Sequence, residues 1–97
     1  MIDMKELKDV VASRILKSGD VVVVVEIYKP EEDGEDFRCG YSISYSEIEK
    51  SGSAMGIDSV QALRLAMAKI DSQLVYLGEK LGKPIFWLDM PSTGFAD

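Results

Sequence analysis

The sequence predicts an α+β fold: an antiparallel three- to four-stranded meander covered on one face by a single long helix in the C-terminal half, with a short extended C-terminal segment. Residues 57–82 predict the helix, because their apolar side chains recur at steps of three and four residues. Residues 21–28 are rich in β-branched side chains, and residues 37–46 alternate between apolar and polar, as strands do. Together these segments describe an antiparallel sheet with a helix on one side.

Residues 10–17 fit either a helical face or a strand when they are considered alone. The next three residues, Ser18, Gly19 and Asp20, are typical of a short turn and lead directly into the β-branched run. Because a hairpin needs a strand on both sides of such a turn, we predict a strand at 10–17.

The second strand is apolar on both faces as far as Val25. One face is expected to meet the helix, which leaves Val22 and Val24 on the other. A sheet with one helix has one open face, so these two valines need a cover, either a second subunit or the C-terminal segment. The alternative is that single apolar residues on a surface need no explanation.

Residues 29–36 contain Pro30 and Gly34 and are predicted to form a loop. The strand at 37–46 should bury one face (Phe37, Cys39, Tyr41, Ile43, Tyr45) and expose a small, polar back (Arg38, Gly40, Ser42, Ser44, Ser46). Residues 47–53 are polar and turn-like. A short fourth strand is expected at residues 54–55.

Asp58 is placed to cap the predicted helix, and Gln61 stands at the capping-box position, from which it would reach back to residue 58. The alternative is a polar site that holds an anion at the helix N-terminus. Gly82 and then Pro84 end the helix. The face expected to be buried comprises Val60, Leu63, Met67, Ile70, Leu74, Leu77 and Leu81.

The chain is expected to form one domain over residues 1–97. Residues 1–9 are expected to be a short helical turn or a frayed lead-in. Residues 84–88 are extended and rich in aromatic side chains. The last segment, 89–97, carries a late Phe95, and we expect it to dock as a tail on the body of the domain.

The composition argues against several kinds of function. A net charge of −6 argues against a nucleic-acid backbone or an anionic membrane as partner. The chain has no histidine and one cysteine, so we expect no His-dependent nucleophile, no structural zinc, no cofactor and no enzymatic activity. It has neither a basic-then-apolar leader nor a long apolar run, which makes the cytoplasm the expected location.

Residues 56–63 read Gly-Ile-Asp-Ser-Val-Gln-Ala-Leu. This segment resembles the Gly-Val-Asp-Ser-X-Gln-Ala-Leu signature of a family of small bacterial domains of unknown function. Further residues are similar to the pattern of that family: Pro30, Asp33, Gly34, Asp36, Cys39, Tyr41, Ile43, Trp87, Gly94 and Phe95. The resemblance covers about residues 10–96, supports a strand at 10–17 and implies no activity.

Three groups of residues are candidates for a site. The acids Glu31, Glu32, Asp33, Glu35 and Asp36 lack the spacing of an EF-hand loop, so a solvated loop or a contact for a basic protein is expected rather than a metal site. Cys39 shares a face with buried residues and is expected to be a small core side chain rather than a nucleophile. The aromatic residues Tyr41, Tyr45, Phe86 and Trp87 are expected to pack in the core or an interface rather than to line a ligand pocket.

The leading hypothesis is a non-enzymatic cytoplasmic interaction domain that forms a homodimer through Val22 and Val24, by pairing of sheet faces or edges. The alternative is an immunity-type or inhibitor protein that binds a basic partner through residues 31–36. An enzyme without histidine or metal is the third and weakest hypothesis.

Overall fold

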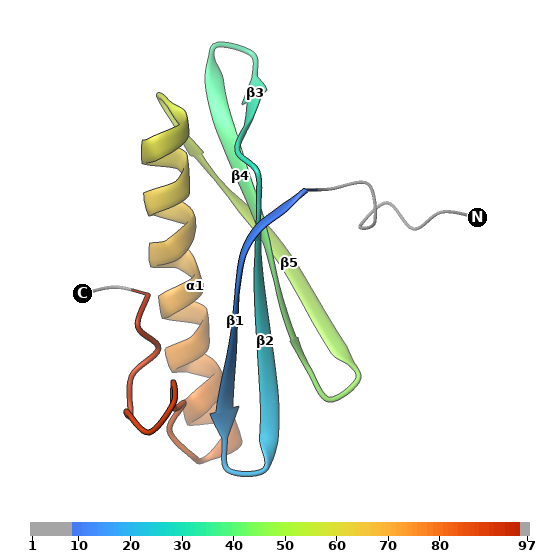
Figure 1. Ribbon diagram of the computed structural model, residues 1–97, viewed down its shortest axis with the longest axis vertical. Helices are drawn as coiled ribbons and strands as arrows, with labels where there is room; N and C mark the ends of the chain where they lie inside the picture. The colour runs from blue at the N-terminus through green and yellow to red at the C-terminus, as the bar shows by residue number, and fades with distance from the viewer. Residues whose placement is uncertain (1–8, 96–97) are drawn as a thin grey trace.

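The computed structural model describes residues 9–95 and contains one antiparallel sheet and one long helix. Figure 1 shows the helix lying along one face of the sheet. The predicted α+β class is therefore confirmed. The predicted lead-in at 1–9 lies outside the described residues apart from Asp9, as do the last two residues of the predicted tail. The elements in chain order are β1 (Val10–Ser18), β2 (Val21–Tyr28), β3 (Glu31–Asp33), β4 (Asp36–Tyr45), β5 (Ile48–Gly56) and α1 (Ser59–Leu81).

The strands form a meander in which β2 and β3 share one edge of β4. Strand β1 pairs with β2, β2 pairs with β4, and β5 pairs with the opposite edge of β4. Ile27 and Glu31 are four positions apart, whereas their partners Tyr41 and Arg38 are three positions apart. The extra residue is a bulge beside Pro30, a residue that cannot donate to the ladder. The loop predicted at 29–36 is thus wrong for 31–33, because these residues continue the pairing of β2 with β4.

The first hairpin confirms the predicted strand at 10–17. Ser18 pairs with Val21 across a two-residue turn, in which Gly19 has φ 61°. Glycine adopts this left-handed conformation without the steric cost of a Cβ. The turn end of the hairpin is also fixed to the end of the helix, because the buried Ser18 hydroxyl donates to the Lys83 carbonyl over 2.9 Å.

The alternation predicted for residues 37–46 holds on the core face, where Cys39, Tyr41, Ile43 and Tyr45 are buried. The prediction of a fully solvated back is wrong at Ser42, which is completely buried. Its cover is Tyr28 at the end of β2, whose hydroxyl donates to Ser42 Oγ over 3.1 Å. The Tyr28 ring lies beside Gly40, where a Cβ would meet it at an ordinary contact distance of 3.5 Å.

Strand β5 is much longer than the two residues predicted for it. It pairs with β4 from Ile48, opposite Tyr45, to Gly56, opposite Phe37. Residues 49–53 are polar or glycine and carry little strand propensity, yet they lie in the strand, so the turn-like prediction for 47–53 is wrong over most of its length. Main-chain pairing with the central strand β4 outweighs that weak propensity.

The helix begins and ends as its capping residues predict. Asp58 Oδ1 accepts from the Gln61 backbone N–H at 2.8 Å. Gln61 reaches back one residue further than predicted, since its Oε1 accepts from the N–H of Ile57 at 2.7 Å. Gly82 adopts a left-handed conformation at φ 73°, and the N–H of Lys83 donates to the Gly78 carbonyl, as in a Schellman motif.

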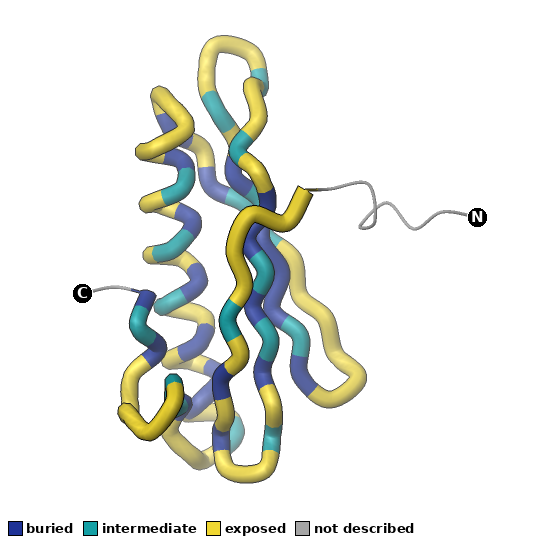
Figure 2. The backbone as a smooth tube through the Cα atoms, viewed as in Figure 1, coloured by how far each residue is buried: buried dark blue, intermediate teal, exposed yellow. Residues whose placement is uncertain are grey.

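The N-terminal half of the helix buries small side chains, which corrects the predicted stripe. Val60 is 63% exposed, whereas Ala62 and Ala66 are completely buried. The backbones approach so closely here that a Cβ on Gly56 would lie only 2.8 Å from Ala62 Cα. Figure 2 shows the buried positions on the sheet-facing side of the helix and along the middle strands. The predicted Ile70, Leu74 and Leu77 are buried, and Leu63, Met67 and Leu81 are half-buried against this core.

The segment after the helix packs along the free edge of β1. Lys17 and Phe86 exchange two backbone hydrogen bonds of 2.9 and 2.7 Å. Further along, the Arg14 guanidinium lies 3.9 Å from the centroid of the Trp87 ring and 4.9 Å from that of Phe95. It also donates to the Thr93 carbonyl over 3.1 Å. These contacts hold residues 86–95 against β1, with Thr93 and Phe95 buried.

Candidate functional site

The face of the sheet opposite the helix carries an aliphatic stripe made of Ile15, Val22 and Val24. Ile15 pairs directly with Val24, and both alternate with core residues, so their side chains point away from the helix. Ile15 is 64% exposed and Val22 is 46% exposed, while Val24 is half-buried. The structure therefore places the predicted Val22 and Val24 together on an open face. It adds Ile15, which sequence reasoning missed although it stands on the same strand face.

Charged residues flank this outer-face stripe at both ends. Lys17 pairs with Val22 at one end, and Glu26 pairs with Ser13 at the other. The neighbouring strands continue the face with small polar side chains, including Ser44 on β4 and Ser51 on β5. The aliphatic part is thus confined to β1 and β2, between a positive end and a negative end.

The predicted acidic residues Glu31, Glu32, Asp33, Glu35 and Asp36 form an acidic hairpin that comprises β3, its turn and the start of β4. Figure 1 shows this hairpin extending past the N-terminal end of α1. Four of the five acids are exposed, and Asp33 forms an ion pair of 2.5 Å with Arg38 on the neighbouring strand. The hairpin presents a compact negative surface that the body of the domain does not cover.

The outer-face stripe and the acidic hairpin are separate surfaces. Val22 lies beside the turn of the first hairpin, whereas the acids lie beyond the opposite end of β2 (Figure 1). A single small ligand would not touch both.

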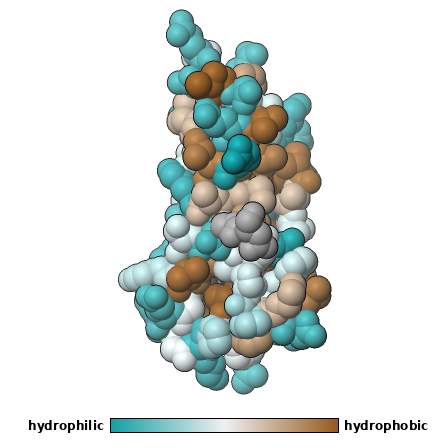
Figure 3. All heavy atoms as spheres, turned by 90° about the vertical axis from the view of Figure 1, so that its left-hand side faces the viewer, coloured by the Kyte–Doolittle hydropathy of each residue, from teal (hydrophilic) through white to brown (hydrophobic). Residues whose placement is uncertain are grey.

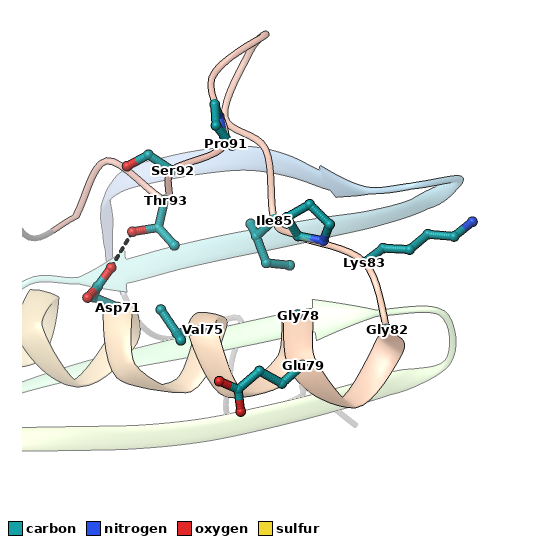
Figure 4. A pocket seen from close by; sticks show the side chains of 11 residues that line it. Asp71, Val75, Gly78, Glu79, Gly82, Lys83, Ile85, Pro91, Ser92 and Thr93 are labelled. Carbon is teal, nitrogen blue, oxygen red and sulfur yellow. Dashed lines mark hydrogen bonds between the residues drawn. The ribbon is translucent and has the colours of Figure 1, made fainter.

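A hollow of about 510 Å³ lies between the C-terminal half of α1 and the segment that follows it (Figure 4). Val75 and Ile85 supply apolar walls, while Thr93 closes one end by donating its hydroxyl to Asp71. In Figure 4, Glu79 and Lys83 extend away from this hollow. Its one inward carboxylate, that of Asp71, is already hydrogen-bonded. We therefore interpret the hollow as a packing cleft that anchors the tail rather than as a reaction centre.

A second hollow, of about 440 Å³, lies where the helix crosses the edge of β5. Sequence reasoning missed it because no strand was predicted at 48–52. We call it the helix–β5 groove. The residues that line it are Ile43, Tyr45, Lys50, Ser51, Gln73, Tyr76, Leu77 and Lys80.

The helix also exposes apolar residues near its N-terminus. Figure 3 views the helix side and shows hydrophobic side chains interspersed with hydrophilic ones over its upper half. Ile57, Val60 and Leu65 are exposed there, with the charged Arg64 and Lys69 between and beyond them. Apolar residues dispersed in this way are ordinary on a protein surface and do not mark a site.

The reactive groups of the described chain serve the fold. Cys39 is fully buried, and its thiol donates to the Tyr28 carbonyl at 3.5 Å. Burial raises the pKa of that thiol above its ordinary value of 9.0, which lowers its reactivity at neutral pH. Burial also raises the pKa of Tyr41, and the hydrogen bond from Gln73 opposes this in part. Among residues 9–95, no three potential ligands lie close enough together to hold a metal ion.

Comparison with known proteins gives a family and no neighbour of known activity. No curated protein and no solved structure matches the chain. In the part of the chain that the structure describes, no helix has the length and apolar character needed to cross a membrane. Residues 12–96, most of the chain, match a family described as a domain of unknown function, and the chain therefore belongs to the DUF6968 family.

Proposed function

We propose that this domain is a non-enzymatic interaction module of a bacterial cytoplasm that forms a homodimer through the outer-face stripe. The observation that carries the proposal is the direct pairing of Ile15 with Val24 on a sheet face that no helix among residues 9–95 covers. Exposed aliphatic residues gathered on one flat face favour association, because burying them removes apolar surface from water. The bacterial origin is supported by the resemblance of residues 56–63 to a bacterial signature.

The charges at the ends of the stripe support a second copy of the same chain as the partner. Two copies can stack face to face about a two-fold axis that lies between the sheets and runs perpendicular to the strands. In this arrangement the Lys17 end of one copy lies over the Glu26 end of the other. The Ile15–Val24 pair then lies at the centre of both surfaces. A two-fold interface requires this kind of self-complementarity. The small Ser44 beside the stripe allows close approach of the partner.

The absence of catalysis in this proposal is supported by how the reactive groups are used. The sequence has no histidine to act as a general base near neutral pH. The single cysteine is buried with a raised pKa, and Asp58 caps the helix. Asp71, the carboxylate that lines the hollow beside the tail, is bonded to Thr93.

Sedimentation equilibrium over a range of protein concentrations tests the homodimer. The wild-type chain should sediment as a dimer, and Ile15→Gln should raise the dissociation constant by about tenfold or more, because an amide replaces the central apolar contact. The matched control is Val60→Gln, which changes an aliphatic residue of equal exposure on the helix and should leave dimerisation unchanged. A wild-type monomer at every concentration would contradict the proposal.

The acidic hairpin supports a second candidate function, the binding of a basic protein as an immunity-type or inhibitor protein would do. The specific observation is its position beyond the body of the domain, with four exposed carboxylates in six residues. Site-specific photocrosslinking in cells from position 35 tests it. A basic partner should crosslink, and Glu31→Gln with Glu32→Gln should abolish the crosslink. Crosslinks that survive this double substitution would exclude a charge-driven contact.

A further inference from the structure

We infer that the helix–β5 groove binds a small organic anion with a flat apolar body, such as an aromatic carboxylate or phosphate ester. The groove lies on the helix side of the sheet, away from the outer-face stripe, so this inference is independent of the proposed dimer. Its volume of about 440 Å³ falls in the range of ligand pockets, which is roughly 300–1,000 Å³.

The charge of the groove is opposite to that of the protein. Of the described residues that line it, two are lysines, Lys50 and Lys80, and none is an aspartate or a glutamate. A second hollow adjoins it at Gln73 and adds Lys69, again without an acidic residue. In a chain with 17 acids and a net charge of −6, such a stretch is a local reversal of charge. Lysines with low-dielectric walls around them attract anions.

The two lysines of the groove are available to a ligand. Neither Lys50 nor Lys80 forms an ion pair within the described residues, and both are exposed at the rim. Lys69 is different, because its ammonium already donates to the Ser53 carbonyl over 2.9 Å. Lys50 belongs to β5 and Lys80 to the last turns of α1, so the sheet and the helix each contribute one lysine to the groove.

Tyr45, one of the residues that line the groove, carries a buried hydroxyl without a partner among residues 9–95. Tyr45 is 6% exposed, and within the described residues its hydroxyl makes no hydrogen bond. Leaving a buried polar group unsatisfied costs roughly 1–3 kcal/mol, so such groups are rare in native proteins. The neighbouring Tyr41 hydroxyl, in contrast, accepts from Gln73 Nε2 at 2.7 Å. A carboxylate or phosphate oxygen that reaches this hydroxyl would accept a hydrogen bond from it, while the lysines balance the negative charge of the ligand.

The apolar part of the groove sets the shape of the ligand. Ile43 and Leu77 form its base and are buried, while the Tyr76 ring stands exposed at its edge. An aromatic ring placed beside Tyr76 would cover apolar surface on both molecules. The combination of an apolar base, one aromatic wall and two cations fits a ring that carries an acidic group better than it fits an inorganic anion.

Amide chemical shifts recorded on the ¹⁵N-labelled full chain test this inference with four probes: phenyl phosphate, benzoate, inorganic phosphate and benzyl alcohol. Phenyl phosphate and benzoate should cause saturable shifts at the amides of Lys50, Gln73, Tyr76 and Lys80. Inorganic phosphate should bind more weakly, because it lacks the ring, and benzyl alcohol should cause no saturable shift. If benzyl alcohol bound as tightly as phenyl phosphate, the electrostatic argument would be overturned. If inorganic phosphate bound as tightly, the claim that the ligand has a flat apolar body would be overturned.

Variants separate the groove from general surface charge. Lys80→Gln should weaken phenyl phosphate binding by about three- to tenfold, whereas Lys29→Gln, an exposed lysine outside the groove, should not change it. Tyr45→Phe should weaken binding without lowering the urea midpoint of unfolding, because the hydroxyl it removes has no partner among the described residues. A folded wild-type chain without saturable shifts, or equal losses in the Lys29 and Lys80 variants, would overturn the inference.

Discussion

The Arg14 guanidinium stacks on the Trp87 ring at 3.9 Å, which joins the first strand to the last segment of the described chain. The same guanidinium donates to the Thr93 carbonyl and lies close to the Phe95 ring. Arg14 is therefore the main polar anchor of a segment that has one short stretch of backbone pairing with the sheet, at Phe86.

Replacing Arg14 with alanine should loosen this segment without unfolding the sheet. We expect a loss of about 1–2 kcal/mol in the free energy of unfolding, from one charge-assisted hydrogen bond and one cation–π contact. Trp87 is the single tryptophan, so its emission should shift to longer wavelength as water reaches the ring. Urea unfolding and fluorescence measure the two effects, with the exposed Arg64→Ala as control. Unchanged Trp87 emission in Arg14→Ala would show that Arg14 does not anchor the segment.

Gly56 permits the close contact between the end of β5 and the start of α1. A Cβ at this position would overlap the backbone of Ala62, which has no freedom to move within the helix. Gly56→Ala should destabilise the domain by about 1–3 kcal/mol, the usual cost of overpacking. Gly40→Ala is a matched strand control, because its Cβ would meet ordinary contacts at 3.5 Å or more. Thermal unfolding followed by circular dichroism should separate the two variants, and equal stabilities would refute the close contact.

Asp58 should contribute to stability as a helix cap. Its carboxylate accepts the Gln61 backbone N–H, so Asp58→Ala should lower the free energy of unfolding by about 1 kcal/mol. Asp58→Asn keeps an oxygen at the cap and should retain most of this stability. Chemical denaturation of both variants checks the expectation. If the alanine variant were as stable as the wild type, the helix-cap interpretation would be wrong, and an anion site at the helix N-terminus would be the better interpretation of Asp58.

The domain should lose stability at alkaline pH because a buried thiol and a buried phenol, those of Cys39 and Tyr41, resist ionisation in the native state. Burial raises the pKa of Cys39 above its ordinary value of 9.0 and that of Tyr41 above 10.0. The unfolded chain therefore releases these protons first. The stabilisation is complete below pH 9.0 and is lost as the pH rises through the folded-state pKa values.

Each group should contribute a slope of up to about 1.4 kcal/mol per pH unit in this range. Urea denaturation at a series of pH values measures the slope. Cys39→Ala should be less stable at neutral pH, because it leaves a small cavity, yet its stability should fall less steeply near pH 9. A wild-type curve that stays flat through pH 10 would contradict the burial of Cys39.

Local sequence signals predict the strands and the helix well where the pattern is strong. The β-branched run in β2 and the alternation in β4 predict strands from the local sequence alone, because the type of each side chain matches its position in the sheet. The ends of the helix follow from Asp58 and Gly82 for the same reason. Strand β5 escapes such reasoning, since its polar residues are held in place by β4 rather than by their own propensity.

The rest of the fold depends on contacts between distant parts of the chain. The choice of Ala62 over Val60 for the buried face is decided by how closely β5 approaches the helix. Arg14 and Thr93 are 79 positions apart in sequence, so no local sequence pattern predicts their contact. The helix–β5 groove could not be predicted without β5, although Gln73, Tyr76 and Lys80 already stand at helical spacing. Val22 and Val24 were predicted to share an open face, and they do.

The homodimer is tested most directly by intermolecular nuclear Overhauser effects in a mixed sample of ¹³C-methyl-labelled and unlabelled chains. The account predicts isotope-filtered cross-peaks from the methyl groups of Ile15, Val22 and Val24 to the unlabelled copy. It also predicts none from Val60, which is as exposed as Ile15 but lies on the helix. A concentrated sample without cross-peaks at these three residues, or with cross-peaks confined to the helix, would contradict the proposed interface.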